Sequence, residues 1–203
     1  MANTDAPFGF RPVMHRSGAP YSGAANLYMA TSGSAMFLGD PVFITGQSNS
    51  TEQDGNPPGS VPIVTLAGTA NTDKITGVIV GVVPTDATST TYRPATKANR
   101  LLWVCDDPDV LFMVQADGTL TQDDVGNAAV MIQTHTGSTV TGLSGSEISS
   151  TLATQGVYVL ERLVPSPDND LASANSKCIV SVRKHTRVHS AANSVAGFGL
   201  GIA

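Results

Sequence analysis

The sequence has few charged residues and few aromatic ones. Charged residues make up 13% of its 203 residues, against about 25% in typical soluble domains, and Phe, Trp and Tyr together make up 5%. Ser, Thr, Gly and Ala take their place. Such a surface is either neutral and kept soluble by its hydroxyl groups, or covered by neighbouring molecules. The low charge favours the second interpretation.

Cysteines and long apolar runs are equally scarce. Cys105 and Cys178 are the only cysteines, and each lies in a short apolar run. We predict two buried free thiols on strands, although a disulfide between them stays open because spacing alone does not decide it. No apolar run reaches the length of a membrane span, and residues 1–5 lack the features of a secretory signal. We expect a soluble protein made in a cytoplasm, with no membrane partner.

Charge is unevenly distributed along the chain. The net charge is −5, yet the sequence from Lys177 onward holds four basic residues and no acidic one. This polarity suits charge-complementary contacts between copies or with a protein partner. Four cations on an acidic protein are too few for a nucleic-acid footprint, so we expect no direct contact with nucleic acid.

Short apolar segments, rich in β-branched residues and separated by Gly, Asp, Asn and Pro, follow one another along the chain. This spacing indicates a sandwich or barrel rather than alternating strands and helices. We predict an all-β fold, namely an antiparallel sandwich or barrel-like domain with an extended N-terminal arm and little helix. The expected strands are Pro41–Thr45, Val61–Leu66, Ile75–Val83, Leu101–Asp106, Val110–Gln115, Ala128–Gln133, Ser138–Thr141, Gly156–Val164 and Cys178–Lys184.

The chain divides into three parts by composition. Residues 1–35 form the arm, residues 36–188 a β-rich globular domain, and residues 189–203 a tail that is either flexible or docked. Ser144 precedes Glu147 at the spacing of a helix-capping box. The poor helix formers that follow leave a short helix at 146–153 and no helix equally open.

The arm carries large apolar side chains without any strand or helix period. Ordering twenty residues costs on the order of 20–40 kcal/mol, while burying its five largest apolar side chains returns roughly ten. We therefore expect the arm to gain order only on a second molecule, such as a neighbouring subunit. A disordered terminus is the alternative.

No motif in the sequence carries catalytic chemistry. His185 and His189 lie four residues apart, but the pattern around them is strand-like and offers no third zinc ligand. Asp106, Asp107 and Asp109 form an acidic cluster that lacks the spacing of a known calcium loop, so we predict a tight turn between two strands. A nucleophile elbow and a phosphate-binding loop are both absent. We expect no enzyme, no cofactor and no metal.

Five segments together resemble a known family. They are Ala6–Val13 (APFGFRPV), Leu38–Val42 (LGDPV), Ile75–Gly81 (ITGVIVG), Val104–Phe112 (VCDDPDVLF) and Gly142–Glu147 (GLSGSE). In these segments the chain resembles the head decoration, or cement, proteins of tailed bacteriophages. The likeness covers most of the chain and is looser over residues 188–203.

The resemblance implies a β-rich subunit on the outer surface of an icosahedral head. Such subunits bridge neighbouring major capsid proteins, often as homotrimers, so that several weak contacts add up. Another virion component, from the tail, the baseplate or the head, and a glycan-binding β-sandwich remain alternatives. The residues that we expect at a partner interface are Phe8, Phe10, Arg11, Val13, Tyr21, Tyr28, Asp107 and Asp109.

Overall fold

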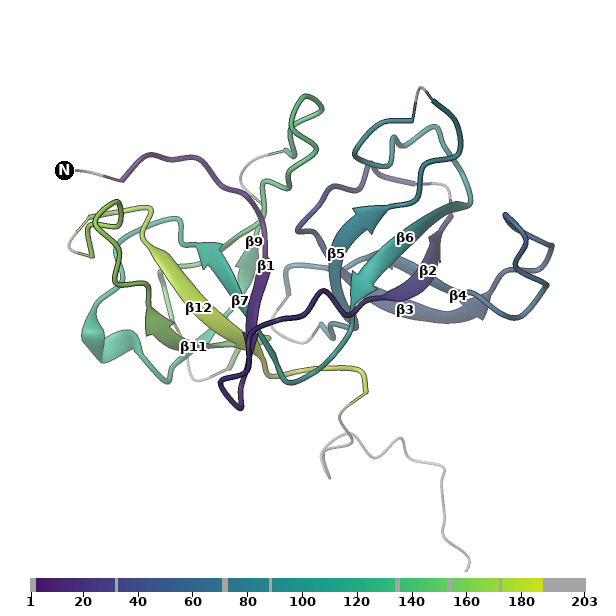
Figure 1. The fold of residues 1–203 in the computed structure, drawn as a ribbon. Coiled ribbons are helices and arrows are strands. Elements are labelled where there is room, and N and C mark those ends of the chain that lie inside the picture. The colour runs from purple at the N-terminus through teal and green to yellow at the C-terminus, as the bar shows by residue number, and fades with distance from the viewer. Residues whose placement is uncertain are drawn as a thin grey trace, which may run out of the picture.

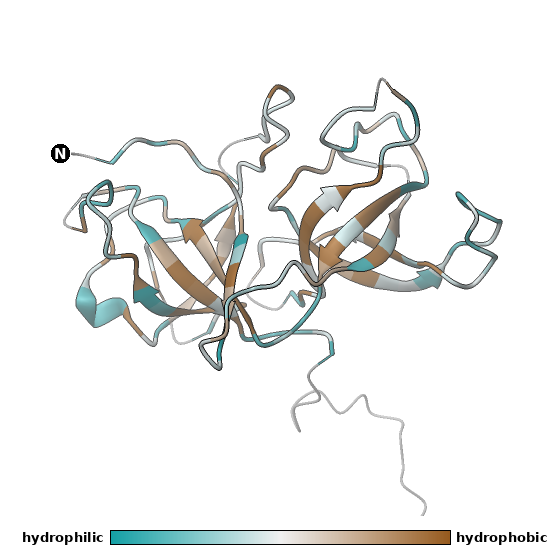
Figure 2. Ribbon diagram, viewed as in Figure 1, coloured by the Kyte–Doolittle hydropathy of each residue, from teal (hydrophilic) through white to brown (hydrophobic). Residues whose placement is uncertain are grey.

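Two β lobes make up the molecule (Figure 1). The structure is a computed structural model and describes residues 3–31, 33–70, 73–87, 89–133, 136–152, 155–171 and 173–187. The strands of both lobes consist largely of hydrophobic residues, whereas many of the connecting segments are more hydrophilic (Figure 2). Within the described ranges no helix is long and apolar enough to span a membrane.

The first lobe is a closed five-stranded barrel with the strand order β2-β4-β3-β5-β6. Strand β2 closes it, because β2 pairs in parallel with β4 and antiparallel with β6. Alternate residues of each strand point into the barrel, and side chains such as Tyr28, Val64 and Leu102 fill its interior. The strands are β2 (Asn26–Ala30), β3 (Pro41–Ser48), β4 (Pro62–Leu66), β5 (Gly77–Val82) and β6 (Arg100–Cys105).

The second lobe is an antiparallel five-stranded sheet with the order β1-β7-β12-β11-β8. Its strands are β1 (Arg11–His15), β7 (Val110–Gln115), β8 (Ala128–Ala129), β11 (Tyr158–Leu163) and β12 (Lys177–Val182). A two-stranded sheet of β9 (Met131–Ile132) and β10 (Glu147–Ile148) lies beside it, and β10 contacts β7. The only helix among the described residues is the 3₁₀ turn η1 (Gln122–Asp124).

The largest buried cluster joins the two lobes. Val78 and Cys105 of the barrel belong to the same cluster as Phe112 and Val180 of the sheet. The chain passes between the lobes in the short turn from β6 to β7. Because the lobes share one core, they form one body rather than two independent domains.

The all-β prediction is confirmed. Strands were predicted correctly where apolar residues run continuously, as in β5, β6, β7 and β12. The segment Ser138–Thr141 is wrong as a strand: it is a turn whose Val140 is 90% exposed. Residues 147–148 form β10 in place of the helix that was left open. Both cysteines are buried free thiols, as predicted.

The extended N-terminal arm is not confirmed. Within residues 1–35, β1 pairs with β7 and β2 completes the barrel, and Phe10 and Tyr28 are each 1% exposed. We expected strand pairing of these residues on a second molecule, whereas β1 and β2 gain their ladder hydrogen bonds within their own lobes. The predicted tail, residues 189–203, lies outside the described residues.

Candidate functional site

The structure places the eight predicted interface residues in three different environments. Phe10 and Tyr28 are core side chains, so their assignment to a partner interface is corrected. Half-buried positions are occupied by Phe8, Val13, Tyr21 and Asp107, and exposed positions by Arg11 and Asp109. Phe8 and Arg11 lie together, since the Arg11 guanidinium carbon is 4.9 Å from the centre of the Phe8 ring.

Glycine divides the N-terminal motif into a buried part and a displayed part. Gly9 has φ +72° and Gly39 has φ +92°, and the Phe10 N–H donates to the Gly39 carbonyl at 2.9 Å. A Cβ on Gly9 would lie 2.6 Å from the Ser144 Cβ, so only glycine permits this approach. Directly after this close approach of Gly9 to Gly39, Phe10 stacks on Tyr158 with ring centres 4.6 Å apart. Phe8, before it, stays at the surface.

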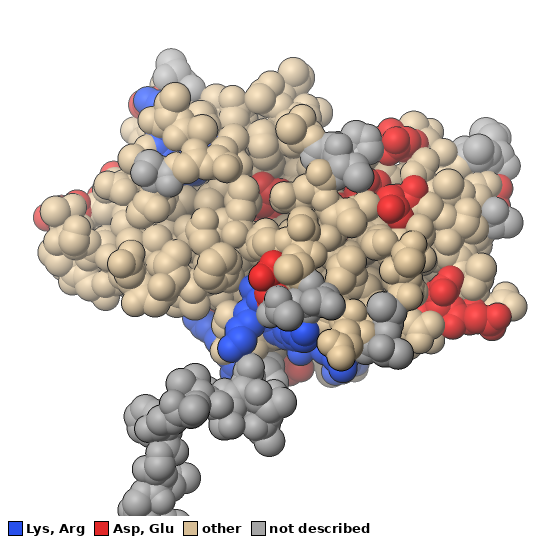
Figure 3. All heavy atoms as spheres, turned by 180° about the vertical axis from the view of Figure 1, so that it is seen from behind, with Lys and Arg blue, Asp and Glu red and all other residues tan. Residues whose placement is uncertain are grey.

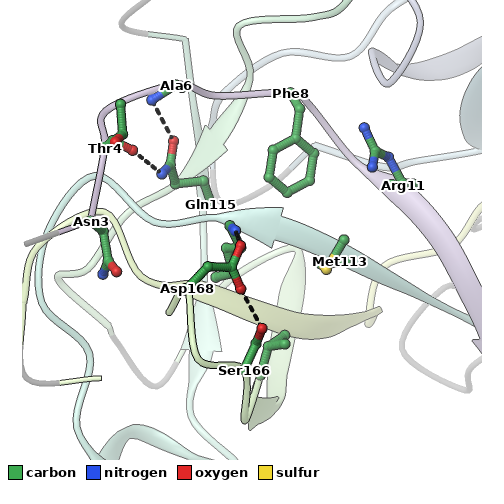
Figure 4. Close-up of a pocket in the computed structure, with 11 residues that line it drawn as sticks. Asn3, Thr4, Ala6, Phe8, Arg11, Met113, Gln115, Ser166 and Asp168 are labelled. Carbon is green, nitrogen blue, oxygen red and sulfur yellow. Dashed lines mark hydrogen bonds and ion pairs between the residues drawn. The ribbon is translucent and has the colours of Figure 1, made fainter. Parts of the chain in front are cut away.

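A cavity of about 580 Å³ opens beside Phe8 and Arg11 (Figure 4). Its floor is the outer face of the five-stranded sheet, where Arg11 of β1 is the cross-strand partner of Met113 of β7. Residues 3–8 line its opposite side. We call it the outer-face cavity. It is lined by Asn3, Thr4, Ala6, Phe8, Arg11, Met113, Gln115, Val164, Ser166, Asp168 and Lys177.

One ion pair in the cavity is already complete. Lys177 Nζ lies 2.5 Å from Asp168 Oδ2, and the Ser166 hydroxyl donates to the other Asp168 oxygen. The hydrogen bond from Lys177, followed by that from Ser166, lowers the pKa of Asp168 to about 2. Within the described part of the chain, Arg11 has no carboxylate at salt-bridge distance. The lining therefore presents one uncompensated positive charge.

Gln115 fastens the N-terminal segment over the sheet. Its Nε2 donates to the carbonyls of Thr4 and Asn175, each at 2.9 Å, and its Oε1 accepts from the Ala6 N–H at 3.1 Å. Asn3 adds a second attachment, accepting from the Asp170 N–H at 2.7 Å. The cavity wall formed by residues 3–8 therefore depends on two amide side chains.

Replacing Gln115 by alanine should lower the free energy of unfolding by about 3 kcal/mol, because three hydrogen bonds worth about 1 kcal/mol each are lost. Urea denaturation measures the loss, and hydrogen exchange at the Ala6 amide should accelerate with it. Gln122→Ala, at an exposed residue of η1, is the control. Unchanged exchange at Ala6 would contradict the fastening role.

The predicted turn at the acidic cluster is present, and it joins strands of different lobes. The Asp109 N–H donates to Asp107 Oδ1 at 2.9 Å, while His15 Nδ1 lies 3.4 Å from Asp107 Oδ2. Asp106 turns inward, into the junction of the lobes. Among the described residues no group of three or more His, Cys, Asp or Glu side chains could hold a metal ion.

Asp106 ties three segments together at that junction. It is 6% exposed, and its carboxylate accepts from Tyr28 Oη at 2.6 Å and Asn26 Nδ2 at 2.8 Å. Arg187 Nη2 lies 2.7 Å from Asp106 Oδ2 and also donates to the Tyr28 hydroxyl. Burial, followed by the hydrogen bond to Asp106, raises the pKa of Tyr28. These are structural contacts.

The predicted histidine pair is described only in part. His185 is 2% exposed and its Nδ1 accepts from the Arg187 N–H at 3.1 Å, whereas His189 lies outside the described residues. Burial lowers the pKa of His185.

The bridge between Ile75 and His185 brings Lys74 and Lys184 near each other. From behind, basic side chains gather at one edge of the molecule (Figure 3).

A second buried carboxylate, Asp40, adjoins a smaller cavity of about 300 Å³. It accepts hydrogen bonds from the Phe37 N–H at 2.8 Å and from the hydroxyls of Ser144 and Ser146. Burial raises the pKa of Asp40, and these hydrogen bonds offset the increase only in part. The carboxylate organises the segments around it, which include two of the stretches that carry the family resemblance.

The raised pKa of Asp40 has a testable sign. A carboxyl whose pKa is higher in the folded state stabilises the fold below its unfolded pKa, and that contribution is lost as pH rises through the folded value. Asparagine cannot ionise. The free energy of unfolding of Asp40→Asn minus that of the wild type should therefore increase from about pH 4 to pH 7, because only the wild type loses stability over this range. Urea denaturation of both proteins across this pH range measures the difference, and Asp109→Asn is the control. A difference in unfolding free energy that stayed constant with pH would contradict the prediction.

Sequence reasoning missed the residues that shape the outer-face cavity apart from Phe8 and Arg11. Gln115 ends an expected strand, and a buried amide at the end of an apolar run was the available signal. Asn3 and Lys177 come close to the cavity only when the chain is folded. The Asn3 side chain, for example, donates to the backbone carbonyls of Asp170 and Ala174.

Comparisons with family models, curated proteins and solved structures find no match to this chain.

Proposed function

We propose that this chain is a structural virion protein that decorates an icosahedral phage head and stabilises it by bridging neighbouring major capsid protein subunits. It would bind the outer surface of the capsid, as a homotrimer. The proposal starts from the resemblance in sequence. It carries no enzymatic step, no cofactor and no metal.

The observation that carries the proposal is the way the Phe-Gly-Phe-Arg-Pro segment is divided. Phe10 anchors the segment in the core, whereas Phe8 and Arg11 stand at the surface between two cavities. The second cavity, of about 270 Å³, lies where this segment meets barrel residues such as Leu38 and Ile79. An accessible phenylalanine and arginine beside concave surfaces suit a protein contact, because aromatic side chains and arginine are enriched at protein interfaces.

The shared core of the lobes also supports a bridging role. A protein that bridges two capsomers must be rigid between the surfaces that contact each of them. Here the lobes are held by one buried cluster, by the β6–β7 turn and by the contacts of Asp106. A surface with few charges, much of which neighbours would cover, fits the same role.

Add-back to purified heads that lack this chain tests the proposal. Saturable binding, density for the chain over capsomer boundaries and a higher disruption temperature of the heads are the expected results. Sedimentation of the free protein tests the trimer. Density in the tail or baseplate would favour another virion component, and absence of binding to any particle would refute the proposal.

Glycan binding is a second candidate because of Trp103. This only tryptophan is 44% exposed on β6 and lies against Gly81 of β5, where a Cβ would be 3.2 Å from the indole Cδ1. An exposed indole can stack on a sugar ring. Glycan-array binding that is lost in Trp103→Ala would favour this candidate, whereas a negative array would remove it.

A further inference from the structure

We propose that the outer-face cavity binds a segment of a neighbouring protein in which an acidic side chain stands beside an apolar one. The inference rests on the proposed function, since the capsid lattice would supply that neighbour. It adds the chemistry of the contact: a carboxylate on Arg11 and an apolar side chain on the floor of the cavity.

The cavity has room and an apolar surface for such a segment. Its volume of about 580 Å³ falls within the usual range of ligand sites, about 300–1,000 Å³. Phe8, Met113 and Val164 supply apolar lining, and the Phe8 and Met113 side chains extend into it (Figure 4). The cavity is partly open to solvent, so a side chain presented on another protein's surface can enter it.

Charge selects an acidic partner. Asp168 is already satisfied by Lys177 and Ser166, which leaves Arg11 as the unpaired charge of the lining. Asp5 belongs to the neighbouring segment but does not line the cavity. A guanidinium binds a carboxylate through two parallel hydrogen bonds, the strongest polar contact available here.

The Arg11 guanidinium is also oriented before any partner arrives. It lies over the Phe8 ring at 4.9 Å, and β1 is fixed by its pairing with β7. A cation held over an aromatic face loses less side-chain freedom on binding. Residues 3–8 are held in turn by Gln115 and Asn3. The site is therefore preorganised from both sides.

Charge reversal tests the inference on whole heads. Arg11→Glu should weaken binding to heads by about tenfold to a hundredfold, the value of a charge-assisted hydrogen bond. Arg16→Glu is the matched control, because Arg16 is exposed, lies just beyond β1 and pairs with Glu161 at 3.0 Å outside the cavity. Circular dichroism and thermal melting confirm that both variants fold. Equal effects of the two reversals, or no effect of Arg11→Glu, would overturn the inference while wild-type binding upheld the proposed function.

A peptide titration decides the inference even if wild-type protein binds no heads. Acetyl-Leu-Asp-Leu-amide should shift the NMR resonances of Ala6, Met113 and Val164 in the full chain, and Arg11→Glu should abolish the shifts. Acetyl-Leu-Asn-Leu-amide tests the carboxylate, and acetyl-Gly-Asp-Gly-amide tests the apolar side chains. No shift with the first peptide, or equal binding of either control peptide, would overturn the inference.

Discussion

Phe10→Ala should lower the free energy of unfolding by about 3–5 kcal/mol, the usual cost of truncating a buried aromatic side chain. Phe10 is 1% exposed and stacks on Tyr158, which is itself fully buried in the second lobe. The truncation would leave a cavity where the N-terminal segment enters the core. Chemical denaturation of the variant measures the loss. A loss below about 1 kcal/mol would mean that the segment contributes little to the fold.

Phe8→Ala is the matched control for this experiment. Phe8 belongs to the same motif two residues earlier, is only half-buried and contacts Arg11 rather than the core. We expect it to cost about 1 kcal/mol of stability and to weaken binding to heads. The pair of variants thus separates the anchoring half of the motif from the displayed half.

Asp106→Ala should cost about 3 kcal/mol, because it removes the acceptor of a buried hydrogen-bond group. Tyr28 and Asn26 lose a charged partner, and Arg187 loses its ion pair. The Arg187 side chain is 52% exposed and can return to water, which keeps the loss at the lower end of values for buried ion pairs. Thermal and urea denaturation measure the change.

Two further substitutions define the origin of that loss. Asp106→Asn keeps an acceptor for Tyr28 but removes the charge, so an intermediate loss of about 1–2 kcal/mol is expected. Asp109→Ala, in the same turn but exposed, should change stability by less than about 0.5 kcal/mol. If Asp109→Ala were as destabilising as Asp106→Ala, the turn rather than the buried network would account for the effect.

The sequence predicts strands well where apolar residues are continuous, and poorly where tertiary pairing decides. β5 and β7 are nearly unbroken apolar runs, so their hydrophobicity alone marks them as central strands. β1, with the sequence RPVMH, contains a proline and carries a bulge in its pairing with β7. Its stability comes from a strand about a hundred residues away, which no local pattern reveals.

The same limit applies to the outer-face cavity. Phe8 and Arg11 were identifiable because aromatic and arginine side chains stand out in a polar segment. Gln115 and Lys177 were not singled out, because the contacts of Gln115 with Thr4 and Ala6 and the ion pair of Lys177 with Asp168 depend on how the chain folds. Phe10 was misassigned for a related reason: the sequence does not reveal that Gly9 and Gly39 let the chain cross closely enough to bury it.

The strand order of the sheet has a consequence for synthesis on the ribosome. The barrel strands are complete by Cys105, whereas β12, one of the last described segments, lies between β7 and β11. Until β12 emerges, β1 and β7 cannot join β11 and β8, and half-made sheets expose pairing edges. The second lobe therefore cannot complete its sheet until β12 has been translated, and before then its unpaired strand edges are open to non-native pairing.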